Sequence, residues 1–294
     1  LAMQLFTSTP QRAQPAARSV AVFEAPVDAP QCIAWCPRTE ALWVGARNGM
    51  VLCDRMIGQQ LYALKEPPAA LCMRNDGEVG LLIGQSGTLS FLRRTAALPG
   101  QGVPTGLHGR WHPFSVRGRF FLSGIGPRGG RLLEVQSQGL RRIARLPDGA
   151  TAGPGATGPE VVRLIDGRLA ISNPEATGLR ASDAGTVLRH CGAHLVSWGT
   201  EAVCVWRHRT DAITTLAQQV TCVDVSPDGR WLALGTLSGE LALVDLDHAR
   251  ERRHPDLRRI STTPVRAVKF SPGGGHLASL GDSVDVWDNG GGDW

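Results

Sequence analysis

Hydrophobic residues occur along this chain in short runs, each about the length of a strand, with glycine, proline and aspartate between them. The clearest segment is VTCVDVSPDGRWLALGTLSGELALVDLD, from Val220 to Asp247. It divides into three apolar runs, 220–225, 230–234 and 240–245, separated by the turn-forming sequences SPDG and TLSG. Runs of this length bounded by such residues are typical of β-hairpins, so three antiparallel strands are predicted here.

The same pattern recurs before and after this segment, which predicts a repeat protein. The segment VRAVKFSPGGGHLASLGDSVDVWD, at 265–288, aligns with it on Ser271-Pro272. Near the start of the chain Cys36-Pro37 takes this place within 32–54, and a further copy spans 71–93. Strongly apolar stretches such as WLAL and LALV indicate strands that are covered on both faces.

Between these copies the pattern is weaker but it continues. Residues 107–146, 160–190 and 193–217 are each predicted to form a further unit, and the TAGPGATGP stretch at 151–159 is predicted to be a loop between strands. The chain then holds seven units of roughly 40 residues, which is the size of one four-stranded propeller blade. Six blades is the alternative interpretation.

The repeat resembles the WD-repeat (WD40-type) family of β-propellers. One unit ends in the dipeptide Trp287-Asp288, while the Gly-His pair that is usual early in such repeats is missing from every unit. The resemblance implies an all-β propeller, most simply of seven four-stranded blades. A closed ring of blades leaves only short, protected strand edges, which lowers the risk of aggregation.

The ring is expected to close through the first part of the chain. The last unit supplies three strands before the glycine-rich sequence NGGGDW, and the apolar segment Ser19–Phe23 precedes the first full unit. This segment is predicted to be the missing outer strand of the last blade. The resulting division is an N-terminal extension at 1–18, a single propeller at 19–288 and a tail at 289–294.

The composition and the lengths of the apolar stretches indicate the cellular compartment and the source of the protein. The chain has 294 residues and seven cysteines. Most of the cysteines lie in apolar runs, which indicates buried free thiols in a reducing compartment. No apolar stretch approaches the roughly 18 residues of a membrane helix, and no signal peptide is recognised, so a cytoplasmic protein is expected. The abundance of alanine, arginine and glycine suggests a divergent bacterial member of the family.

Few residues suggest chemistry of their own. His190, Cys191 and His194, with Cys204, are possible zinc ligands, but a polar turn beside a buried cysteine explains them more simply. The glycine-rich sequence at 124–130 lacks the following helix that a phosphate loop needs. Neither a metal nor a cofactor is therefore predicted.

The net charge of +5 is mild for this length. Its densest part is HARERRHPDLRR at 248–259, where the outer strand of the sixth unit is expected. Arg252 and Arg253 in this stretch are candidate contacts for an acidic partner, although charge on an outer strand also blocks unwanted pairing. Nucleic acid is a less favoured partner, because few aromatic residues lie nearby for base stacking.

The predicted function is that of a non-catalytic protein-interaction scaffold, for example an accessory subunit of a bacterial multi-protein system. The resemblance implies that the loops entering each first strand gather at one end of the central channel. The matching positions are Gln31, Thr221 and Arg266, with Ala69 as a further position. Arg266 is the best single candidate contact, because arginine is enriched among residues that dominate interfaces. The alternatives are a propeller hydrolase or lyase with its site in the central funnel, and a nucleic-acid binder with a basic face.

Overall fold

The computed structural model describes 16 segments of the chain: 18–22, 29–47, 49–54, 58–93, 102–126, 129–137, 139–146, 150–154, 159–165, 168–172, 187–191, 194–198, 202–207, 211–216, 219–246 and 257–289. These residues form strands and turns and contain no helix, so the all-β prediction is confirmed. In particular, no helix of the described residues is long and apolar enough to cross a membrane.

The strands, in chain order, are β1 (Arg18–Val22), β2 (Pro30–Trp35), β3 (Leu42–Ala46), β4 (Gly49–Asp54), β5 (Gly58–Tyr62), β6 (Pro68–Met73), β7 (Val79–Gly84), β8 (Thr88–Arg93), β9 (Val103–Pro104), β10 (Arg110–Val116), β11 (Arg119–Gly126), β12 (Gly129–Gln136), β13 (Gly139–Leu146), β14 (Thr151–Pro154), β15 (Pro159–Ile165), β16 (Arg168–Ser172), β17 (Val187–Cys191), β18 (His194–Trp198), β19 (Ala202–Arg207), β20 (Asp211–Leu216), β21 (Val220–Val225), β22 (Trp231–Thr236), β23 (Glu240–Asp245), β24 (Leu257–Arg259), β25 (Ala267–Phe270), β26 (His276–Leu280) and β27 (Val284–Asp288).

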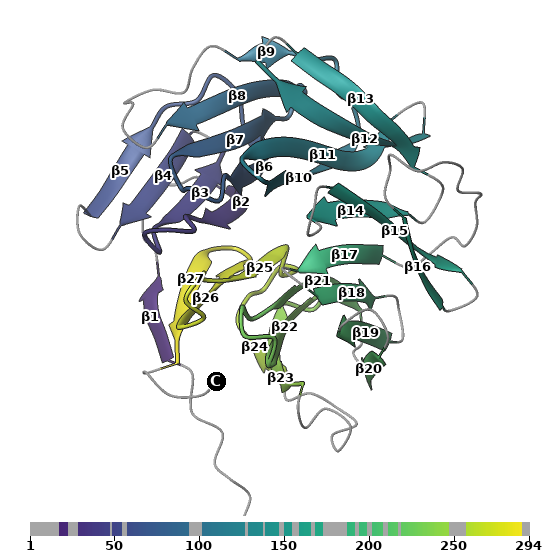
Figure 1. The fold of residues 1–294 in the computed structure, drawn as a ribbon. Helices are drawn as coiled ribbons and strands as arrows, with labels where there is room; N and C mark the ends of the chain where they lie inside the picture. Colours follow the sequence, from purple (N-terminus) through teal and green to yellow (C-terminus); the bar gives the residue numbers. More distant parts are fainter. Residues whose placement is uncertain are drawn as a thin grey trace, which may run out of the picture.

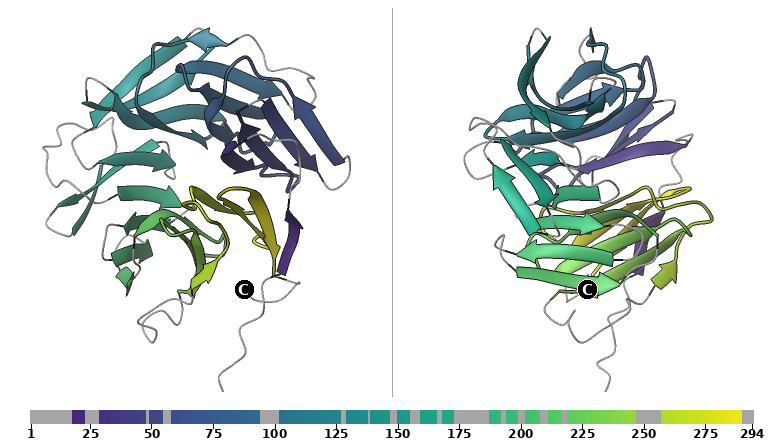
Figure 2. Two further views of the ribbon diagram at one scale, coloured as in Figure 1. Left: turned by 180° about the vertical axis from the view of Figure 1, so that it is seen from behind. Right: turned by 90° about the vertical axis from the view of Figure 1, so that its right-hand side faces the viewer.

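The strands of the described residues form seven antiparallel sheets, six of four strands and one, β14–β16, of three. The sheets follow one another around a common centre in chain order (Figure 1). In the first six sheets the first strand lies nearest this centre and later strands lie progressively outward, and in the last sheet β25 is innermost and β1 outermost (Figures 1 and 2). The sheets therefore have the radial arrangement of a propeller, while the choice between seven and six blades stays a prediction.

The ring closes through β1, as the sequence predicts. This strand pairs antiparallel with β27, so that Arg18 faces Asp288 and Val22 faces Asp285. The last sheet consequently has the order β1-β27-β26-β25 and contains both ends of the described chain. The strand spans Arg18–Val22 rather than the predicted Ser19–Phe23, and Phe23 lies outside the described residues. The other predicted domain boundaries remain predictions.

The Ser-Pro-x-Gly sequences close the first turn of their sheets with a shared set of bonds. In the β21–β22 turn, the backbone N–H of Trp231 donates to Ser226 Oγ at 2.8 Å, and Gly229 donates to the Ser226 carbonyl at 2.8 Å. In the β25–β26 turn, His276 donates to Ser271 Oγ at 3.1 Å. Glycine suits the last position of the turn, because Gly229 has a φ of 75° that other residues rarely adopt.

The core consists of apolar seams between neighbouring sheets rather than one central mass. All six residues of β22 are buried. Leu232 and Leu234 pack toward the β17–β20 sheet with Val196 and Val203, whereas Trp231 and Ala233 pack toward the β25–β27 sheet with Phe270 and Leu277. Burial on both faces explains why this strand is continuously apolar instead of alternating.

Two predicted element assignments in the weak middle of the chain are wrong. Residues 151–154, predicted as loop, form β14 and pair with β15, and Ala152 N–H also donates to Ser123 Oγ at 2.9 Å. The glycines and prolines there hide the strand, since proline is tolerated at the end of a ladder. Residues 187–190, predicted to end one unit, belong to β17, which begins the next sheet by pairing with β18.

We expect the two-sided seams to dominate stability. Leu232 is fully buried, so Leu232→Ala should lower the free energy of unfolding by about 2–5 kcal/mol through lost contacts and a cavity. Leu237, which is 52% exposed in the adjoining turn, is the matched control. Leu237→Ala should change the free energy of unfolding by less than about 0.5 kcal/mol. Chemical denaturation measures both, and equal effects would contradict the seam description.

The closing strand gives a second prediction. Deletion of residues 1–24 removes β1 and leaves the edge of β27 unpaired, so the melting temperature should fall clearly. Adding a synthetic peptide of residues 16–24 should restore part of the loss, because the peptide can occupy the vacant edge. Calorimetry of the deleted protein with and without the peptide checks this. An unchanged melting temperature after deletion would show that β1 does not hold the ring closed.

Candidate protein-binding site

A cavity of about 410 Å³ lies where the innermost strands meet. Its lining comes from β2, β6, β10, β14 and β25 and from the residues that precede them: Gln31, Cys32, Ile33, Ala69, Ala70, Leu71, Gly109, Trp111, His112, Pro113, Phe114, Thr151, Ala152, Gly153, Pro154, Arg266, Ala267 and Lys269. The described lining is mostly apolar. It carries the cationic Arg266 and Lys269 and the imidazole of His112, and none of these described residues is a carboxylate.

Arg266 is exposed and stands just before β25. Its Nη2 donates to the carbonyl of Gly281 at 2.8 Å, and its backbone N–H donates to the Leu280 carbonyl at 2.7 Å. The guanidinium is therefore held against the β26–β27 turn and has further donors to offer, since the group carries five N–H bonds in a planar fork. Such a fork suits a carboxylate on a binding partner.

The turn that anchors Arg266 is itself tied to the loop before β25. The carboxylate of Asp282 accepts hydrogen bonds from the Thr262 backbone N–H at 3.0 Å and from Thr262 Oγ1 at 2.6 Å. The Asp282 N–H donates to Ser261 Oγ at 3.1 Å. The hydrogen bonds from Thr262 and its neighbours hold the pKa of Asp282 well below its usual range. Loop and turn therefore form one unit that positions Arg266.

The β6–β9 sheet has an equivalent link between the loop before its first strand and the turn between β7 and β8. Here the acid lies on the loop, where Glu66 accepts from the Ser86 N–H at 2.8 Å and from Ser86 Oγ at 2.8 Å. Burial acts to raise the pKa of Glu66, but the hydrogen bonds from Ser86 bring this pKa below its ordinary value. Two sheets thus fix the entry to their inner strand by the same kind of contact with exchanged roles.

Three inner strands are joined to one another through β25. Asp224 on β21 is buried, and it accepts from Lys269 Nζ at 3.0 Å and from the Phe270 N–H at 2.9 Å. On the other side, Trp35 Nε1 on β2 donates to the Lys269 carbonyl at 2.8 Å. The backbone and side chain of Lys269 are thus fixed by both neighbouring sheets, which holds this part of the cavity wall rigid.

The structure places some of the predicted contact positions in the cavity wall and others elsewhere. Arg266, Gln31 and Ala69 do line the cavity. Thr221 is not among the described lining residues. It stands at the junction of two sheets, where its Oγ1 donates to the Val265 carbonyl and lies 3.0 Å from the Gly235 carbonyl. Its hydroxyl is used within the fold, and this contact depends on a neighbouring loop that the repeat alignment does not show.

Two further candidates, Arg252 and Arg253, lie outside the described residues. The outer strand expected in their segment is present as β24, at its C-terminal end. Conversely, sequence reasoning did not single out Lys269, Trp111 or His112 at the cavity. A signal was available for Lys269, because it lies on the first strand of a repeat, and first strands line the axis of a propeller.

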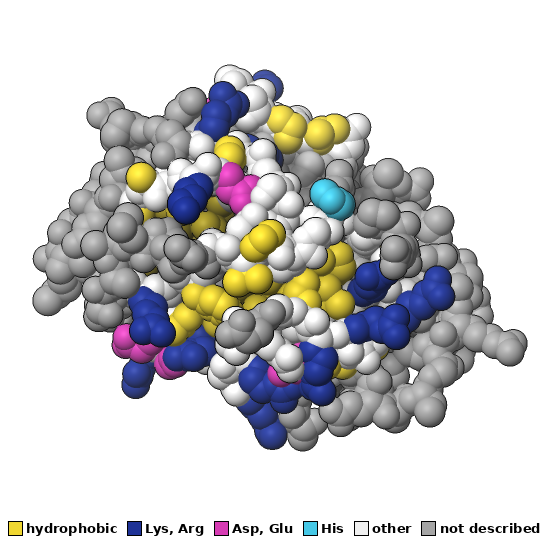
Figure 3. Space-filling model, turned by 90° about the horizontal axis from the view of Figure 1, so that it is seen from above, with side chains coloured by type: hydrophobic (Ala, Val, Ile, Leu, Met, Phe, Trp, Pro, Cys, Tyr) yellow, Lys and Arg dark blue, Asp and Glu magenta, His cyan; other side chains and the backbone are white. Residues whose placement is uncertain are grey.

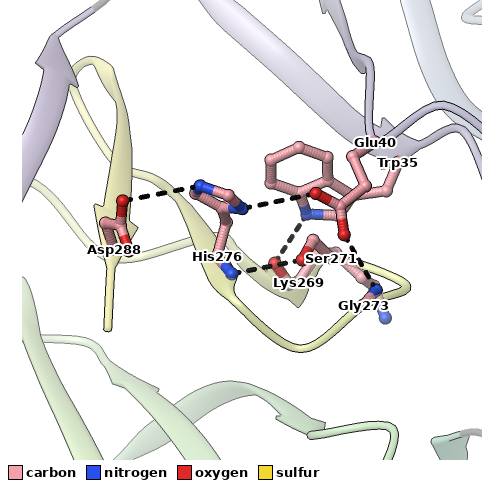
Figure 4. A network of polar contacts seen from close by, with 7 residues as sticks. All are labelled: Trp35, Glu40, Lys269, Ser271, Gly273, His276 and Asp288. Atoms are coloured by element: carbon pink, nitrogen blue, oxygen red, sulfur yellow. Dashed lines mark hydrogen bonds and ion pairs between the residues drawn. The ribbon is translucent and has the colours of Figure 1, made fainter. Parts of the chain in front are cut away.

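A second group of polar side chains connects the first and last sheets where the ring closes (Figure 4). His276 Nδ1 lies 3.7 Å from Glu40 Oε2, and His276 Nε2 lies 3.7 Å from Asp288 Oδ2. Glu40 also accepts from the Gly273 N–H at 3.1 Å. The imidazole faces two carboxylates, and the Ser271 hydroxyl accepts a hydrogen bond from the backbone N–H of His276.

The described cysteines behave as small apolar residues. Among the described residues, Cys32, Cys36, Cys72 and Cys222 form no disulfide bond. Burial raises the pKa of the Cys32 and Cys72 thiols to about 12, so both are protonated at neutral pH and neither is a nucleophile.

The side chains of the possible zinc ligands His190, Cys191, His194 and Cys204 lie outside the described part of the structure. Their backbone places Cys191 opposite His194, whereas Cys204 is opposite Ser197, about 10 Å further along β18. Among the side chains that are described, no group of three or more His, Cys, Asp or Glu residues could hold a metal ion.

Comparison with known proteins agrees with this architecture. The family model described as "WD domain, G-beta repeat" matches residues 210–243, which run from the end of one sheet into β23. The meiotic recombination protein rec14 of Schizosaccharomyces pombe is 33% identical over 92 residues, or 29% of this chain. That match spans 30% of the length of rec14, less than a third of it.

Two solved structures share the fold over most of the chain. The β-propeller domain of Cps50 (Swd1) from Myceliophteria thermophila has a TM-score of 0.68 at 14% identity, covering 92% of this chain and 99% of that one. Hydrazine synthase from Kuenenia stuttgartiensis has a TM-score of 0.64 at 12% identity, covering 90% of this chain and 96% of that one.

A ring of antiparallel sheets that closes through its first strand, together with these neighbours, defines a β-propeller. The repeat sequence, the matched family model and the similarity to rec14 define its type. The chain is a β-propeller of the WD-repeat kind.

The link made by Asp282 predicts a pH dependence. The pKa of Asp282 is lower in the folded protein than in the unfolded chain. Its carboxylate therefore contributes fully to folding stability above the unfolded pKa of about 3.9, and this contribution is lost as the pH falls through the folded pKa. Asp282→Asn should therefore lower the melting temperature at neutral pH, and its difference from the unmodified protein should shrink below about pH 4.

Asp285 in the same hairpin is a control of opposite sign. Burial raises the pKa of Asp285, so Asp285→Asn should leave the melting temperature at neutral pH unchanged or raise it. Thermal melts of both variants between neutral and acidic pH test the pair. A deficit of Asp282→Asn that stayed constant at low pH would mean that its carboxylate does not make the link.

Proposed function

We propose that this protein is a non-catalytic scaffold that binds another protein at the mouth of its central cavity. The observation that carries the proposal is the described wall of this cavity, an apolar surface with Arg266 and Lys269 on it. Interfaces that bind strongly combine apolar area with arginine, because the guanidinium pairs with carboxylates while its stem buries apolar surface. The expected partner segment carries a carboxylate next to an apolar side chain.

Preorganisation supports binding at this place. The fork of Arg266 rests on the Gly281 carbonyl, and Lys269 is fixed from two neighbouring sheets. Side chains already held in place lose little conformational entropy when a partner arrives, so more of the contact energy is expressed as affinity. A rigid wall of this kind suits recognition, and the exposed guanidinium of Arg266 is complementary to an acidic group.

Fold alone does not separate a scaffold from an enzyme, because one structural neighbour is named hydrazine synthase. The proposal for a scaffold rests on the chemistry of the wall. We further infer that the protein is an accessory subunit of a bacterial multi-protein system, and that it works in the cytoplasm, where its buried thiols would stay reduced.

The test compares two arginines of similar exposure. Arg266→Glu should abolish recovery of the partner from extracts of the native host, and it should weaken the purified complex at least about tenfold, or 1.4 kcal/mol. Arg259→Glu, on the outer strand β24, makes the same charge change away from the cavity and should retain binding. Quantitative mass spectrometry and calorimetry give the readouts. Full affinity in Arg266→Glu at an unchanged melting temperature would remove the cavity mouth from the interface.

A further inference from the structure

The outer part of the β10–β13 sheet carries an arginine cluster that the cavity does not use. Arg142 and Arg145 on β13 are exposed, and Arg131 on β12 is partly exposed. The rim of the ring seen from above, over β8, β9, β12 and β13, shows Lys and Arg side chains beside a band of hydrophobic ones (Figure 3). This cluster lies on the circumference of the ring rather than at its axis.

Strand register places the three arginines on one face of the sheet. Arg131 stands directly opposite Arg145, and Arg142 stands opposite Leu133. A bulge at Ile143 inserts one residue between these pairs, which brings Arg142 and Arg145 to the same side of β13. Because Leu133 packs in the seam toward the β6–β9 sheet, the arginines stand on the face of the sheet that forms this seam, near its outer edge.

The other face of the same strands is arranged differently. There Glu134 is buried and forms ion pairs with Arg119 at 2.5 Å and with Arg141 at 2.7 Å. Burial acts to raise the pKa of Glu134, but the hydrogen bonds from Arg141 and Arg119 bring it below the ordinary value. By contrast, no carboxylate of the described residues lies within ion-pair distance of Arg131, Arg142 or Arg145.

Partly buried apolar side chains pack against the same seam. Phe91 of the neighbouring sheet and Leu140 and Val135 of this one are only partly buried against the seam. Phe91 packs on Phe120 with ring centroids 6.1 Å apart, so the aromatic ring has a fixed support. The outer part of this seam thus combines apolar area with cations that have no described acidic partner.

We propose that this surface, which we call the arginine seam (Phe91, Arg131, Leu140, Arg142 and Arg145), binds an acidic, partly hydrophobic segment of a partner protein. Carboxylates of the segment pair with the guanidinium groups, and its apolar side chains cover Phe91 and Leu140. The surface is separate from the cavity mouth, so a scaffold could hold two partners at once.

Two features favour an acidic protein segment over nucleic acid. Phosphate backbones have no apolar side chains to cover Phe91 and Leu140, which would stay exposed in such a complex. Nucleic-acid affinity also depends on many phosphate contacts spread along a track, whereas this cluster holds three arginines on two adjacent strands. A short acidic peptide can satisfy both parts of the surface.

The direct opposition of Arg131 and Arg145 makes the proposal testable. Like charges facing each other across neighbouring strands destabilise a sheet, and a bound anion relieves the repulsion. Removing charge from this face should therefore weaken binding without lowering stability. Removing charge from the Glu134 face should lower stability without weakening binding, because it leaves a buried carboxylate without its partners.

The experiment uses two double variants that each remove two positive charges, Arg142→Gln/Arg145→Gln and Arg119→Gln/Arg141→Gln. The probes are a labelled Asp/Glu-rich peptide containing Leu and Phe, the same peptide with Asn and Gln in place of its acids, and a duplex DNA. Fluorescence anisotropy measures binding, and thermal melts measure stability. If the second double variant does not fold, Arg141→Gln alone takes its place.

We expect the acidic peptide to bind the unmodified protein and its neutral counterpart not to bind. Arg142→Gln/Arg145→Gln should weaken the acidic peptide at least tenfold with an unchanged or higher melting temperature. Arg119→Gln/Arg141→Gln should bind within twofold of the unmodified protein and melt lower. No binding of the acidic peptide, equal weakening in both variants, or tighter binding of the DNA would each overturn the proposal.

Discussion

Each fully described strand in the middle of a sheet packs against the sheets on both sides. Such a sheet therefore needs both neighbours to shield its apolar residues from water. The buried residues of β22 divide between two seams, and the same division recurs from sheet to sheet. Stability is therefore shared around a ring and depends on its closure. The pairing of β1 with β27 supplies this closure, since it places the first strand in the last sheet.

This constraint also shapes the candidate binding surfaces. Near the axis the inner strands crowd together, and hydrogen bonds such as those of Asp224 and Trp35 hold β25 between its neighbours. Because β25 forms part of the cavity wall, these bonds also hold that part of the wall in place. At the circumference the seams open, because outer strands have no neighbour beyond them, and here β13 exposes arginine on the face that continues the seam. One architecture thus presents a preorganised mouth and a more open rim.

The sequence predicts the fold well where local chemistry decides the outcome. The Ser-Pro-x-Gly turns at Ser226 and Ser271 are closed by their own hydroxyls, so hairpins follow from a few residues. Assignment failed for β14 and β17, because which sheet a strand joins depends on pairing with distant residues. The same limit applies to the site: Arg266 was found by alignment, whereas the hydroxyl of Thr221 is used by a loop of the next sheet.

The antiparallel closure also determines how the molecule would respond to tension applied at its ends. Arg18, where β1 begins, faces Asp288, where β27 ends, so a pull on both ends separates the two strands from the same side. The backbone bonds between antiparallel strands lie across the strand direction, and such a pull loads them one pair after another. A ring whose sheets are held together by their seams would therefore open under force by unzipping at this junction.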